Sequence, residues 1–280
     1  MAAVINAYAP PAPEDLSACY GPDPYDLNFL FPLALPALES ARVRLVPFVP
    51  RIHAKPYIAQ VAARPELQRW FPFDHTSLEE LLPFLERRVR RDPGFVAFAV
   101  LDKTRAPGGE DDKDAHPGED AHDESESGHD HGQGGRFAGV IALLNASAAN
   151  LSVEIGWVLT FPAFQRTHVT SHAIGVLLRA CLNLPSDPAH PGLGLRRVQW
   201  TAHTHNRASV RAAERMGLTV EGVVRWAWVL EEGKEGHGRA VRAGDVQGGR
   251  PGRDSVLLSV CADDWEEGGR ERVSAVMERA

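Results

Sequence analysis

The sequence predicts one mixed α/β domain with a largely antiparallel central sheet and helices on its faces. Strand and helix patterns follow in the order β, α, α, β, β, β, α, β, α, β, β. Two of the strands are separated only by "NASAAN" (145–150), a spacing that favours a hairpin. A later strand–helix–strand crossover, at 151–203, favours a parallel pair in the same sheet. No internal repeat is present, so we expect one domain and not two.

The composition indicates a globular protein and argues against several classes of function. The chain has 280 residues, 44% of them apolar, enough for one large core. No apolar run approaches the roughly 18 residues of a membrane span, and the first residues lack the features of a secretory signal. The net charge of −7 argues against nucleic-acid binding over the whole surface. Cys19, Cys181 and Cys261 lack metal or disulfide spacing, which favours a reducing, cytoplasmic setting.

The first hundred residues predict an arm followed by strands and helices. Residues 1–40 are proline-rich, and we interpret them as an extended arm. Strand patterns cover 41–49 and 94–102, and helical patterns cover 50–64 and 77–92. In the second helix, Ser77 is a favoured N-cap, and Glu79 and Glu80 suit the first turn.

The middle of the chain contains a segment that cannot bury enough apolar surface to order itself. Residues 104–135 are rich in Gly, Pro, Asp, Glu and His, so we expect a disordered insertion. His116, His122, His129 and His131 invite a metal hypothesis because imidazoles are good ligands. Their irregular spacing favours a solvated loop, and we expect no metal site.

Strands and helices alternate through the rest of the chain. Strand patterns cover 136–146, 151–160, 195–203, 218–232 and 253–265, and helical patterns cover 168–182 and 206–217. Asn206 is a favoured N-cap, and Gly217 a favoured stop. We expect a flexible loop at 231–252, a helix or tail at 266–280, and a single domain at 41–265.

The turn "FQRTHVTS" (164–171) joins an apolar strand to an apolar helix. A helix start leaves backbone N–H groups unpaired at the positive end of its dipole, and such turns bind phosphate. Gln165 and Arg166 add side-chain donors, and Thr167 and Thr170 add hydroxyls. Because glycines are missing, these residues alone leave two interpretations open: a plain connector and an anion-binding turn.

Two motifs around this turn resemble the GNAT N-acetyltransferase superfamily. The stretch "EIGWVLTFPAFQRT" (154–167) is similar to its strand and phosphate-binding turn, and "RRVQWTAHTHNRASVRAAERMGLTVEGVVR" (196–225) is similar to a second block. The motifs look most like the branch similar to ribosomal-protein N-terminal acetyltransferases. His168 and Thr170 stand where that branch has glycine and glycine or alanine, so their side chains are expected to narrow the phosphate seat.

The resemblance implies a GNAT-like fold, in which a splayed parallel strand pair holds acetyl-CoA. Pantetheine would pair with the backbone of the strand, and pyrophosphate would be held by the turn and first helical residues. Asn206 would reach toward the pantetheine arm, and Arg211 would meet the outer phosphate. The implied cofactor-binding residues are Trp157, Val158, Leu159, Gln165, Arg166, Thr167, His168, Val169, Thr170, Ser171, Asn206 and Arg211.

The resemblance also implies that a primary amine attacks the thioester directly. Glu154 is the candidate base, acting through water, and Ser209 is the candidate proton donor to the leaving thiolate. A structural carboxylate explains Glu154 equally well, and a plain N-cap explains Asn206 equally well. His203 and His205 are further candidates, either for binding the substrate or for the base, although such residues more often cap a strand end.

The acceptor site is expected in the segments that match the family least. Trp70, Phe71 and Asp74, together with Trp226, would bind a primary amine, either a small amine or a peptide N-terminus. Their aromatic and acidic character favours a cationic, partly apolar amine. A CoA-binding regulatory protein with weak or no activity is the alternative function. Monomer and homodimer both stay open, and neither nucleic acid nor membrane is expected as a partner.

Overall fold

The computed structural model describes residues 5, 7, 9, 12, 15–105 and 134–279. Its strands form one sheet in the order β1-β2-β3-β4-β5-β7-β6. They are β1 Val43–Pro47, β2 Val96–Asp102, β3 Arg136–Ser147, β4 Ser152–Thr160, β5 Arg197–His203, β6 Thr219–Val229 and β7 Gly252–Cys261. All neighbours are antiparallel except β4 and β5, which confirms the predicted mixed α/β class.

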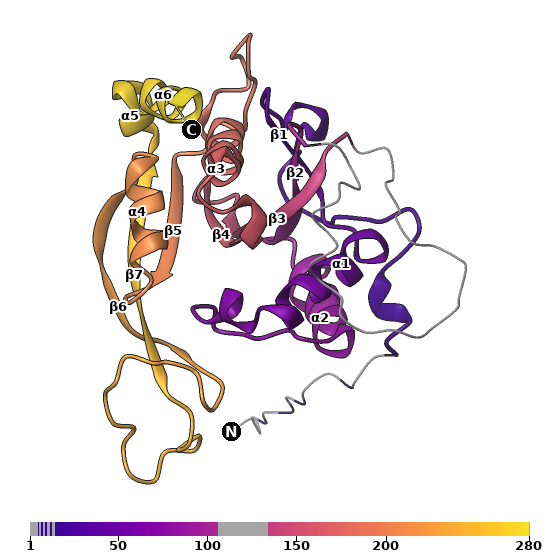
Figure 1. Ribbon diagram of the computed structural model, residues 1–280. Coiled ribbons are helices and arrows are strands. Elements are labelled where there is room, and N and C mark those ends of the chain that lie inside the picture. Colours follow the sequence, from indigo (N-terminus) through magenta and orange to yellow (C-terminus); the bar gives the residue numbers. More distant parts are fainter. Residues whose placement is uncertain are drawn as a thin grey trace.

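Helices surround the sheet, with α1 and α2 lying together as a pair apart from α3 and α4 (Figure 1). The helices are α1 Pro50–Ala63, α2 Leu78–Phe84, α3 His168–Leu182, α4 Arg207–Arg215, α5 Ala262–Asp264 and α6 Arg270–Arg279. The central helix α3 is buried along most of its length and packs closely on α6. A Cβ at Gly175 would lie 2.3 Å from Met277 Sδ, so only glycine permits this approach.

The parallel strands β4 and β5 separate after three residue pairs. Ser152 pairs with Arg197, and the register ends where Glu154 pairs with Gln199. Beyond that point β4 continues to Thr160 and β5 to His203 without pairing to each other. The expected splayed strand pair is therefore present, and Glu154 marks the place where it opens.

A β-bulge in β4 lies inside this opening. Val140 pairs with Leu159 and Ala142 with Gly156, so Trp157 and Val158 together oppose one residue of β3. The φ angle of Trp157 is +45°, in the left-handed region that bulky residues rarely adopt. Its indole is buried among aromatic rings of the α1–α2 layer, including Tyr57 and Phe84 at 5.8 and 5.4 Å between centroids. This packing holds the bulge in place.

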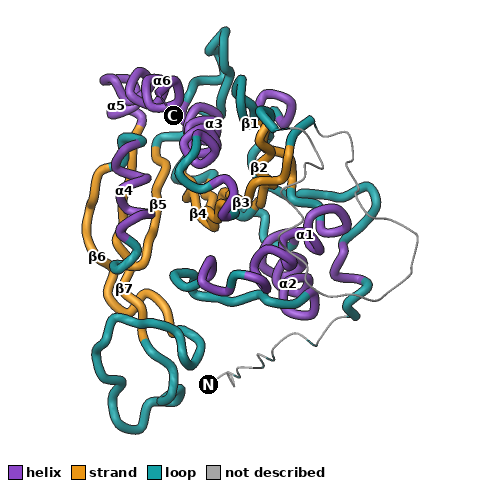
Figure 2. The backbone as a smooth tube through the Cα atoms, in the orientation of Figure 1, coloured by secondary structure: helices purple, strands orange, loops and turns teal. Residues whose placement is uncertain are grey.

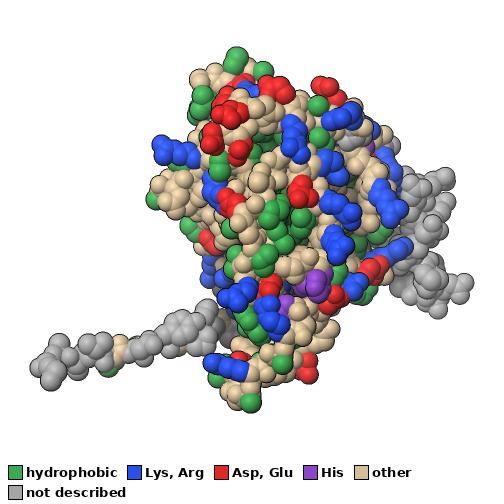
Figure 3. Space-filling view, turned by 90° about the vertical axis from the view of Figure 1, so that its left-hand side faces the viewer, with side chains coloured by type: hydrophobic (Ala, Val, Ile, Leu, Met, Phe, Trp, Pro, Cys, Tyr) green, Lys and Arg blue, Asp and Glu red, His purple; other side chains and the backbone are tan. Residues whose placement is uncertain are grey.

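The outer edge of the sheet is formed by β6, and most of its residues are exposed. Figure 3 faces this side of the molecule and shows apolar side chains near the middle of the face. Val223 and Trp226 are among the exposed apolar residues of β6, at 54% and 48%. Next to them a second bulge places Arg225, Trp226 and Ala227 opposite Asp254, whose carboxylate accepts the Trp226 N–H at 2.8 Å.

The ends of the chain differ from the predicted elements in detail. In the arm, Leu30 N–H donates to the Pro93 carbonyl at 2.9 Å, and neighbouring Phe side chains pack on the core. The last strand ends at Cys261 and not at Trp265, because Asp264 accepts the Cys261 N–H at 2.9 Å and so starts α5. Most of the expected disordered insertion, residues 106–133, lies outside the described residues. Among the residues that the structure describes, no helix combines the length and apolar character needed to span a membrane.

Candidate active site

The strand-to-helix turn after β4 is held by its own polar side chains. The amide of Gln165 donates to the Thr160 carbonyl at 3.0 Å. Thr167 is the N-cap of α3: its hydroxyl donates to the Phe164 carbonyl at 2.6 Å and accepts the Val169 N–H at 3.3 Å. Arg166 is exposed and has a φ angle of +60°, the left-handed backbone conformation that a glycine usually adopts in such a turn.

This capping leaves donors at the start of α3. Among the described residues, the N–H groups of His168 and Thr170 have no hydrogen-bond acceptor. They lie in the first helical turn, where the aligned peptide dipoles place partial positive charge. The turn therefore offers convergent donors to an anion, although it contains no glycine.

The two side chains that replace the usual small residues are both engaged elsewhere. His168 is buried, its Nδ1 accepts from Arg42 at 3.0 Å, and its Nε2–H donates to Asp102 Oδ1 at 3.1 Å. The ring is thereby tied to the end of β2. The Thr170 hydroxyl lies 2.8 Å from the Thr160 hydroxyl and joins the first turn of α3 to the end of β4. The His168 side chain thus points toward β1 and β2, whereas the Thr170 side chain stays at the turn between β4 and α3.

A second set of free backbone groups lies along the open part of β4. Trp157, Val158 and Leu159 follow the point at which β5 leaves the strand, so their edge toward β5 has no strand partner. The side chain of Trp157 belongs to the core, and only its backbone is available to a ligand. An extended chain of amides that ends in a diphosphate fits this unpaired edge and the helix start beyond it.

Asn206, Ser209 and Arg211 lie around the start of α4. The side-chain oxygen Oδ1 of Asn206 accepts the Ser209 N–H at 3.1 Å, so Asn206 is the N-cap predicted for this helix. The Ser209 hydroxyl accepts the indole N–H of Trp200 at 3.0 Å. Arg211 is exposed, and its one hydrogen bond within the described residues is from Nε to the Arg207 carbonyl at 3.3 Å.

Glu154 is buried at the opening of the strand pair, with 4% of its surface exposed. Its Oε1 accepts the Thr201 hydroxyl at 2.5 Å, and its Oε2 accepts the side-chain amides of Asn145 at 2.9 Å and Gln199 at 3.1 Å. Three neutral donors hold the carboxylate without an ion pair. Consecutive strand residues point to opposite faces, so Glu154 lies with Gln199 and Thr201 on one face while Trp200 faces α4.

Residues 64–77, between α1 and α2, form a covering segment: they lie over the face of the sheet that carries Glu154, near the end of β5. The ring centroids of Trp70 and His203 are 4.8 Å apart. His203 Nδ1 accepts the His205 N–H at 3.0 Å, and its Nε2–H donates to the Glu235 carbonyl at 3.1 Å. Burial and then the charge of nearby Arg253 lower the pKa of His203 to about 4. The imidazole is therefore neutral at pH 7. Because Nδ1 already accepts one hydrogen bond and Nε2–H donates another, the ring has no free lone pair to take a proton.

The loop between β6 and β7 folds back on this segment (Figure 2). Lys234 donates to Asp74 Oδ1 at 2.6 Å and to the Gln68 carbonyl at 3.2 Å. Arg69 forms an ion pair with Glu235. Between these partners lies a pocket of about 360 Å³, lined by residues of both segments. The loop expected to be flexible is thus fastened at its base.

The four predicted acceptor residues do not all come together. Trp70 and Asp74 lie in the covering segment, and Phe71 stacks on Phe73 beside them at 5.4 Å between centroids. Trp226 lies apart: its ring packs on His237, and its N–H binds Asp254. Asp254 points to the face of β7 opposite to that of Arg253, which donates to the Trp70 carbonyl.

Sequence reasoning missed several groups around the site. Asn145 and Thr201 carry no motif signal, because they reach Glu154 only through the pairing of β3, β4 and β5. Lys234 and Arg253 reach the covering segment across more than 150 residues of chain. A basic residue inside the apolar last strand was the one signal that pointed to Arg253.

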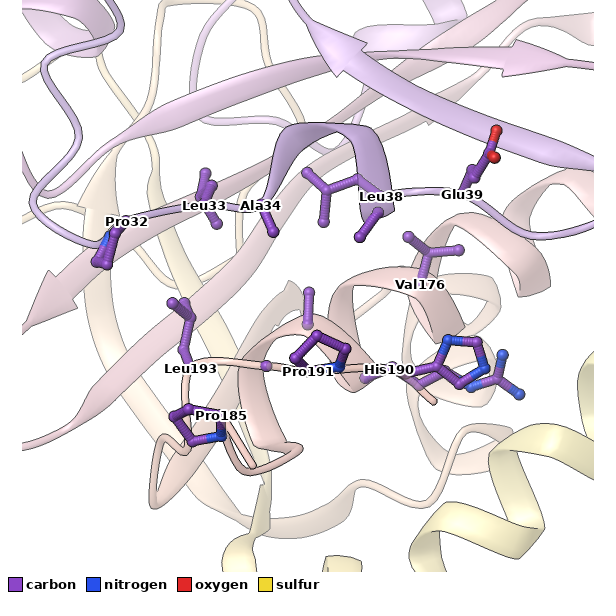
Figure 4. A pocket seen from close by; sticks show the side chains of 14 residues that line it. Pro32, Leu33, Ala34, Leu38, Glu39, Val176, Pro185, His190, Pro191 and Leu193 are labelled. Atoms are coloured by element: carbon purple, nitrogen blue, oxygen red, sulfur yellow. The ribbon is translucent and has the colours of Figure 1, made fainter. Parts of the chain in front are cut away.

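Two other features lie away from these residues. An apolar pocket of about 130 Å³ lies between the arm and α3, where Leu38, Val176 and Leu193 face one another (Figure 4). Cys261, Asp263 and Asp264 bring three possible metal-ligand atoms within 4.8 Å at the exposed start of α5. Asp264 already caps that helix, which accounts for the cluster without an ion.

The fold and site together define an acyl-CoA-type transferase: an opened parallel strand pair, a donor-bearing helix start and a buried carboxylate between them. Residues 42–219 match the family model described as "Acetyltransferase (GNAT) domain". The protein belongs to this GNAT acetyltransferase family, whose members transfer an acyl group from acetyl-CoA to amine substrates. No curated protein matches the sequence.

Solved structures share the fold at low sequence identity. A GCN5-related N-acetyltransferase from Brucella melitensis is 23% identical, with a TM-score of 0.58 over 85% of this chain and 84% of that one. Mycobacterium smegmatis RimJ, in complex with CoA-disulfide, is 17% identical, with a TM-score of 0.53 over 88% and 92%. Vibrio cholerae spermidine N-acetyltransferase, in complex with CoA and spermine, is 12% identical, with a TM-score of 0.52 over 81% and 99%.

Proposed function

We propose that the protein is an N-acetyltransferase that moves an acetyl group from acetyl-CoA directly to a primary amine, with Glu154 as the proton acceptor. The observation that carries this proposal is the position of Glu154. It is buried at the point where β4 and β5 part, between the open strand edge and the segment that contains Trp70.

Cofactor binding uses backbone groups more than side chains. The pantetheine arm pairs with the free edge at Trp157, Val158 and Leu159. The diphosphate takes N–H groups in the stretch from Arg166 through Ser171, with Gln165 and Arg166 beside it. The N–H of Val169 is already accepted by Thr167, so those of His168 and Thr170 are the principal donors. The free side-chain amide of Asn206 contacts the arm, and exposed Arg211 meets the outer phosphate.

Acetyl-CoA supplies an acetyl group already activated as a thioester. The acceptor enters as an ammonium ion and loses one proton to Glu154, directly or through water. Its nitrogen then forms a bond to the acetyl carbonyl carbon while the C–S bond breaks. The Val158 N–H donates to the carbonyl oxygen as charge develops on it, and the Ser209 hydroxyl gives its proton to the leaving thiolate. The nitrogen, which is positively charged after the attack, loses its second proton, and that proton restores the Ser209 hydroxyl.

The donors around Glu154 suit a proton acceptor that stays in place. The side chains of Asn145, Gln199 and Thr201 hold the carboxylate in one orientation, and none of them is charged. Among the described residues, no side chain forms an ion pair with this carboxylate, so it is free to pair with the ammonium group of an acceptor.

The finer assignments follow from the sequence motifs. We propose the branch similar to ribosomal-protein N-terminal acetyltransferases because the block at 196–225 matches it in step. Solved structures of the fold include RimJ with CoA-disulfide and a spermidine N-acetyltransferase with CoA and spermine, so both peptide and small-amine acceptors belong in a test. The cysteines Cys19, Cys181 and Cys261 are all unpaired, which supports a cytoplasmic setting.

The test is a mass-spectrometric acetylation screen over peptides and small amines, with CoA and acetyl-CoA binding measured by calorimetry in parallel. We expect micromolar cofactor binding, acetyl transfer to at least one amine class, and loss of transfer in Glu154→Gln. Absence of cofactor binding at millimolar concentration would contradict the proposal.

A second candidate is a CoA-binding regulatory protein without turnover. The Thr160–Thr170 hydroxyl contact favours it, because this contact occupies the turn where the family usually has a small residue. Cofactor binding without transfer to any amine in the screen would support this candidate, and robust turnover would exclude it.

A further inference from the structure

A buried arginine lies at the acceptor end of the proposed site. Arg253 is the second residue of β7, and its side chain is buried, with 5% of the residue exposed. Its Nη1 donates to the Trp70 carbonyl at 3.1 Å, whereas its Nε is buried without a partner. Burial lowers the pKa of Arg253 to about 10, so the side chain is charged at neutral pH. A buried charge with unfilled donors is costly to leave unpaired.

The strand register places Arg253 on the same face as Glu154. His203 pairs with Ser255, and Gln199 pairs with Ser259, across β5 and β7. Paired and alternate residues point to one face, so Arg253, Ser255, Gln199 and the Glu154 side chain share a face. The negative charge of Glu154 acts on Arg253 and raises its pKa against the effect of burial.

The other charged groups near Arg253 already have partners. Arg69 pairs with Glu235, and Lys234 pairs with Asp74 at 2.6 Å. His203 is neutral, with both ring nitrogens engaged. Among the described residues, no carboxylate lies within ion-pair distance of the Arg253 guanidinium. The hydroxyl of Ser255, two residues along the strand, is also buried without a partner.

We propose that Arg253 forms an oxygen-binding subsite for the acceptor, so that the substrate carries a carbonyl oxygen beside its reacting amine, as a peptide N-terminus does. This inference rests on the proposed function. The carboxylate of Glu154 takes the ammonium end, and the guanidinium donors take the neighbouring oxygen through charge-assisted hydrogen bonds.

The subsite also disfavours a second positive charge. A polyamine would bring another ammonium near a guanidinium in a poorly solvated site, where like charges repel strongly. The cationic acceptor favoured by the aromatic and acidic residues of the sequence is therefore replaced by an α-amino carbonyl compound. The ion pairs of Asp74 and Glu235 neutralise the acidic residues that had pointed to a cation.

The first arm of the test compares acceptors with and without an oxygen beside the amine. Propylamine, L-alaninamide, L-alanine, trialanine amide and spermidine are each offered to the wild-type protein with acetyl-CoA, and thiol release and mass spectrometry are the readouts. Rates are compared at equal concentrations of free amine. We expect kcat/KM for alaninamide and trialanine amide to exceed that for propylamine by about 10- to 100-fold, the range for hydrogen bonds to charged groups.

The acceptor series also separates the possible sources of the oxygen. A preference for trialanine amide over L-alanine indicates a peptide N-terminus, and the reverse order indicates a free amino acid. If kcat/KM for propylamine or spermidine equals or exceeds that for alaninamide, the inference is wrong, although the proposed function stands. If no acceptor releases thiol, the proposed function itself fails.

The second arm removes the guanidinium. Arg253→Met keeps the approximate length of the side chain, and we expect it to lower kcat/KM for alaninamide about tenfold or more beyond its effect on propylamine, mainly through KM. The matched control is Arg239→Met, because Arg239 pairs with Asp254 on the other face of β7. CoA affinity and the melting temperature are measured for both variants.

A purely structural role for Arg253 predicts a different pattern. Loss of the Trp70 contact alone would reduce activity equally for alaninamide and propylamine, and that result overturns the inference. If Arg253→Met does not fold, Arg253→Lys keeps the charge while changing the donor geometry. We then expect the ratio of kcat/KM for alaninamide to that for propylamine to be lower than in the wild type but still above one. An unchanged ratio would contradict the inference.

Discussion

The two ends of the proposed site are built in opposite ways. At the cofactor end, backbone groups of one continuous stretch, from β4 into α3, are left without partners by the opened strand pair and the helix start. At the acceptor end, side chains from distant segments close on one another through ion pairs such as Asp74–Lys234 and Arg69–Glu235. The first end is prepared to receive a large ligand, and the second is prepared to select a small one.

We infer that the affinity for the cofactor and the selectivity between acceptors depend on separate parts of the chain. A change at the turn before α3 should alter cofactor binding without changing the acceptor preference. A change in the covering segment or in the β6–β7 loop should do the reverse. Glu154 lies between the two ends and contacts the acceptor, so its loss should affect the chemical step and acceptor binding but not cofactor affinity.

The largest expected effect is therefore that of Glu154→Gln. We expect kcat to fall by about 10²- to 10⁴-fold, the range for general acid–base catalysis, because an amide cannot take the proton of the acceptor. CoA affinity should stay within about twofold of the wild type. Glu221→Gln is the control, since Glu221 lies on the same sheet and pairs with Arg197 outside the site. An unchanged kcat in steady-state assays would show that Glu154 is not the proton acceptor.

The next effect concerns the helix start and separates an N–H group from a hydroxyl. Thr170→Ala and Thr170→Pro both remove the contact to Thr160, but only the proline removes the backbone donor. Proline is tolerated in the first turn of a helix, where this N–H has no helical acceptor. We expect Thr170→Pro to bind CoA about tenfold more weakly than Thr170→Ala in calorimetry. Equal affinities for the two variants would exclude that N–H as a phosphate ligand.

A third effect is the sensitivity of the acceptor end to acid. His75 is packed against Phe73 and Phe84, its Nδ1 has no partner, and burial lowers its pKa to about 4. The folded pKa lies below the unfolded value of 6.5, so the unfolded chain binds more protons between these values. His75 therefore does not reduce the free energy of unfolding above about pH 6.5, and it reduces this free energy progressively as the pH is lowered from 6.5 toward 4.

His75→Phe should remove this part of the acid sensitivity. We expect the variant to gain about 1–2 kcal/mol over the wild type at pH 4.5 and little at pH 7.5, measured by urea unfolding. The exposed His190 provides the control variant His190→Gln, which should follow the wild type at both pH values. A constant difference between wild type and His75→Phe across this range would contradict the assignment.

The smallest effect is expected for the fastening of the loop. Lys234→Met removes one ion pair and the bond to the Gln68 carbonyl. Because Asp74 is 43% exposed, we expect a loss of at most about 1 kcal/mol in stability. The acceptor KM should rise two- to fivefold while CoA affinity stays constant. Lys103→Met is matched to it, since Lys103 also binds one carboxylate and one carbonyl but far from the acceptor.

The cofactor end could be predicted from the sequence because its contacts are local. Asn206 as N-cap and the strand leading into α3 follow from residue types and spacing within about twenty residues. The N-cap role of Thr167 was not predicted, because its hydroxyl was interpreted as a phosphate donor. The order of strands and helices followed from periodicity in the same way. The positive φ at Arg166 could not be predicted, because arginine gives no signal for a left-handed turn.

The acceptor end could not be predicted because its contacts are non-local. Arg253 and Trp70 are 183 residues apart in the chain, and Lys234 and Asp74 are 160 apart. Trp226 appeared equivalent to Trp70 in the sequence, but the bulge pinned by Asp254 places it apart. No spacing rule connects such residues until the register of β5, β6 and β7 is known.

The central claim is that CoA binds along the open edge of β4 with its diphosphate at the start of α3. Amide hydrogen exchange measured with and without CoA tests this claim most directly. We expect slower exchange in 155–171 when CoA is present, with β1 and the β6–β7 loop unaffected. Unchanged exchange in 155–171, with CoA bound by calorimetry, would place the cofactor elsewhere and contradict the account.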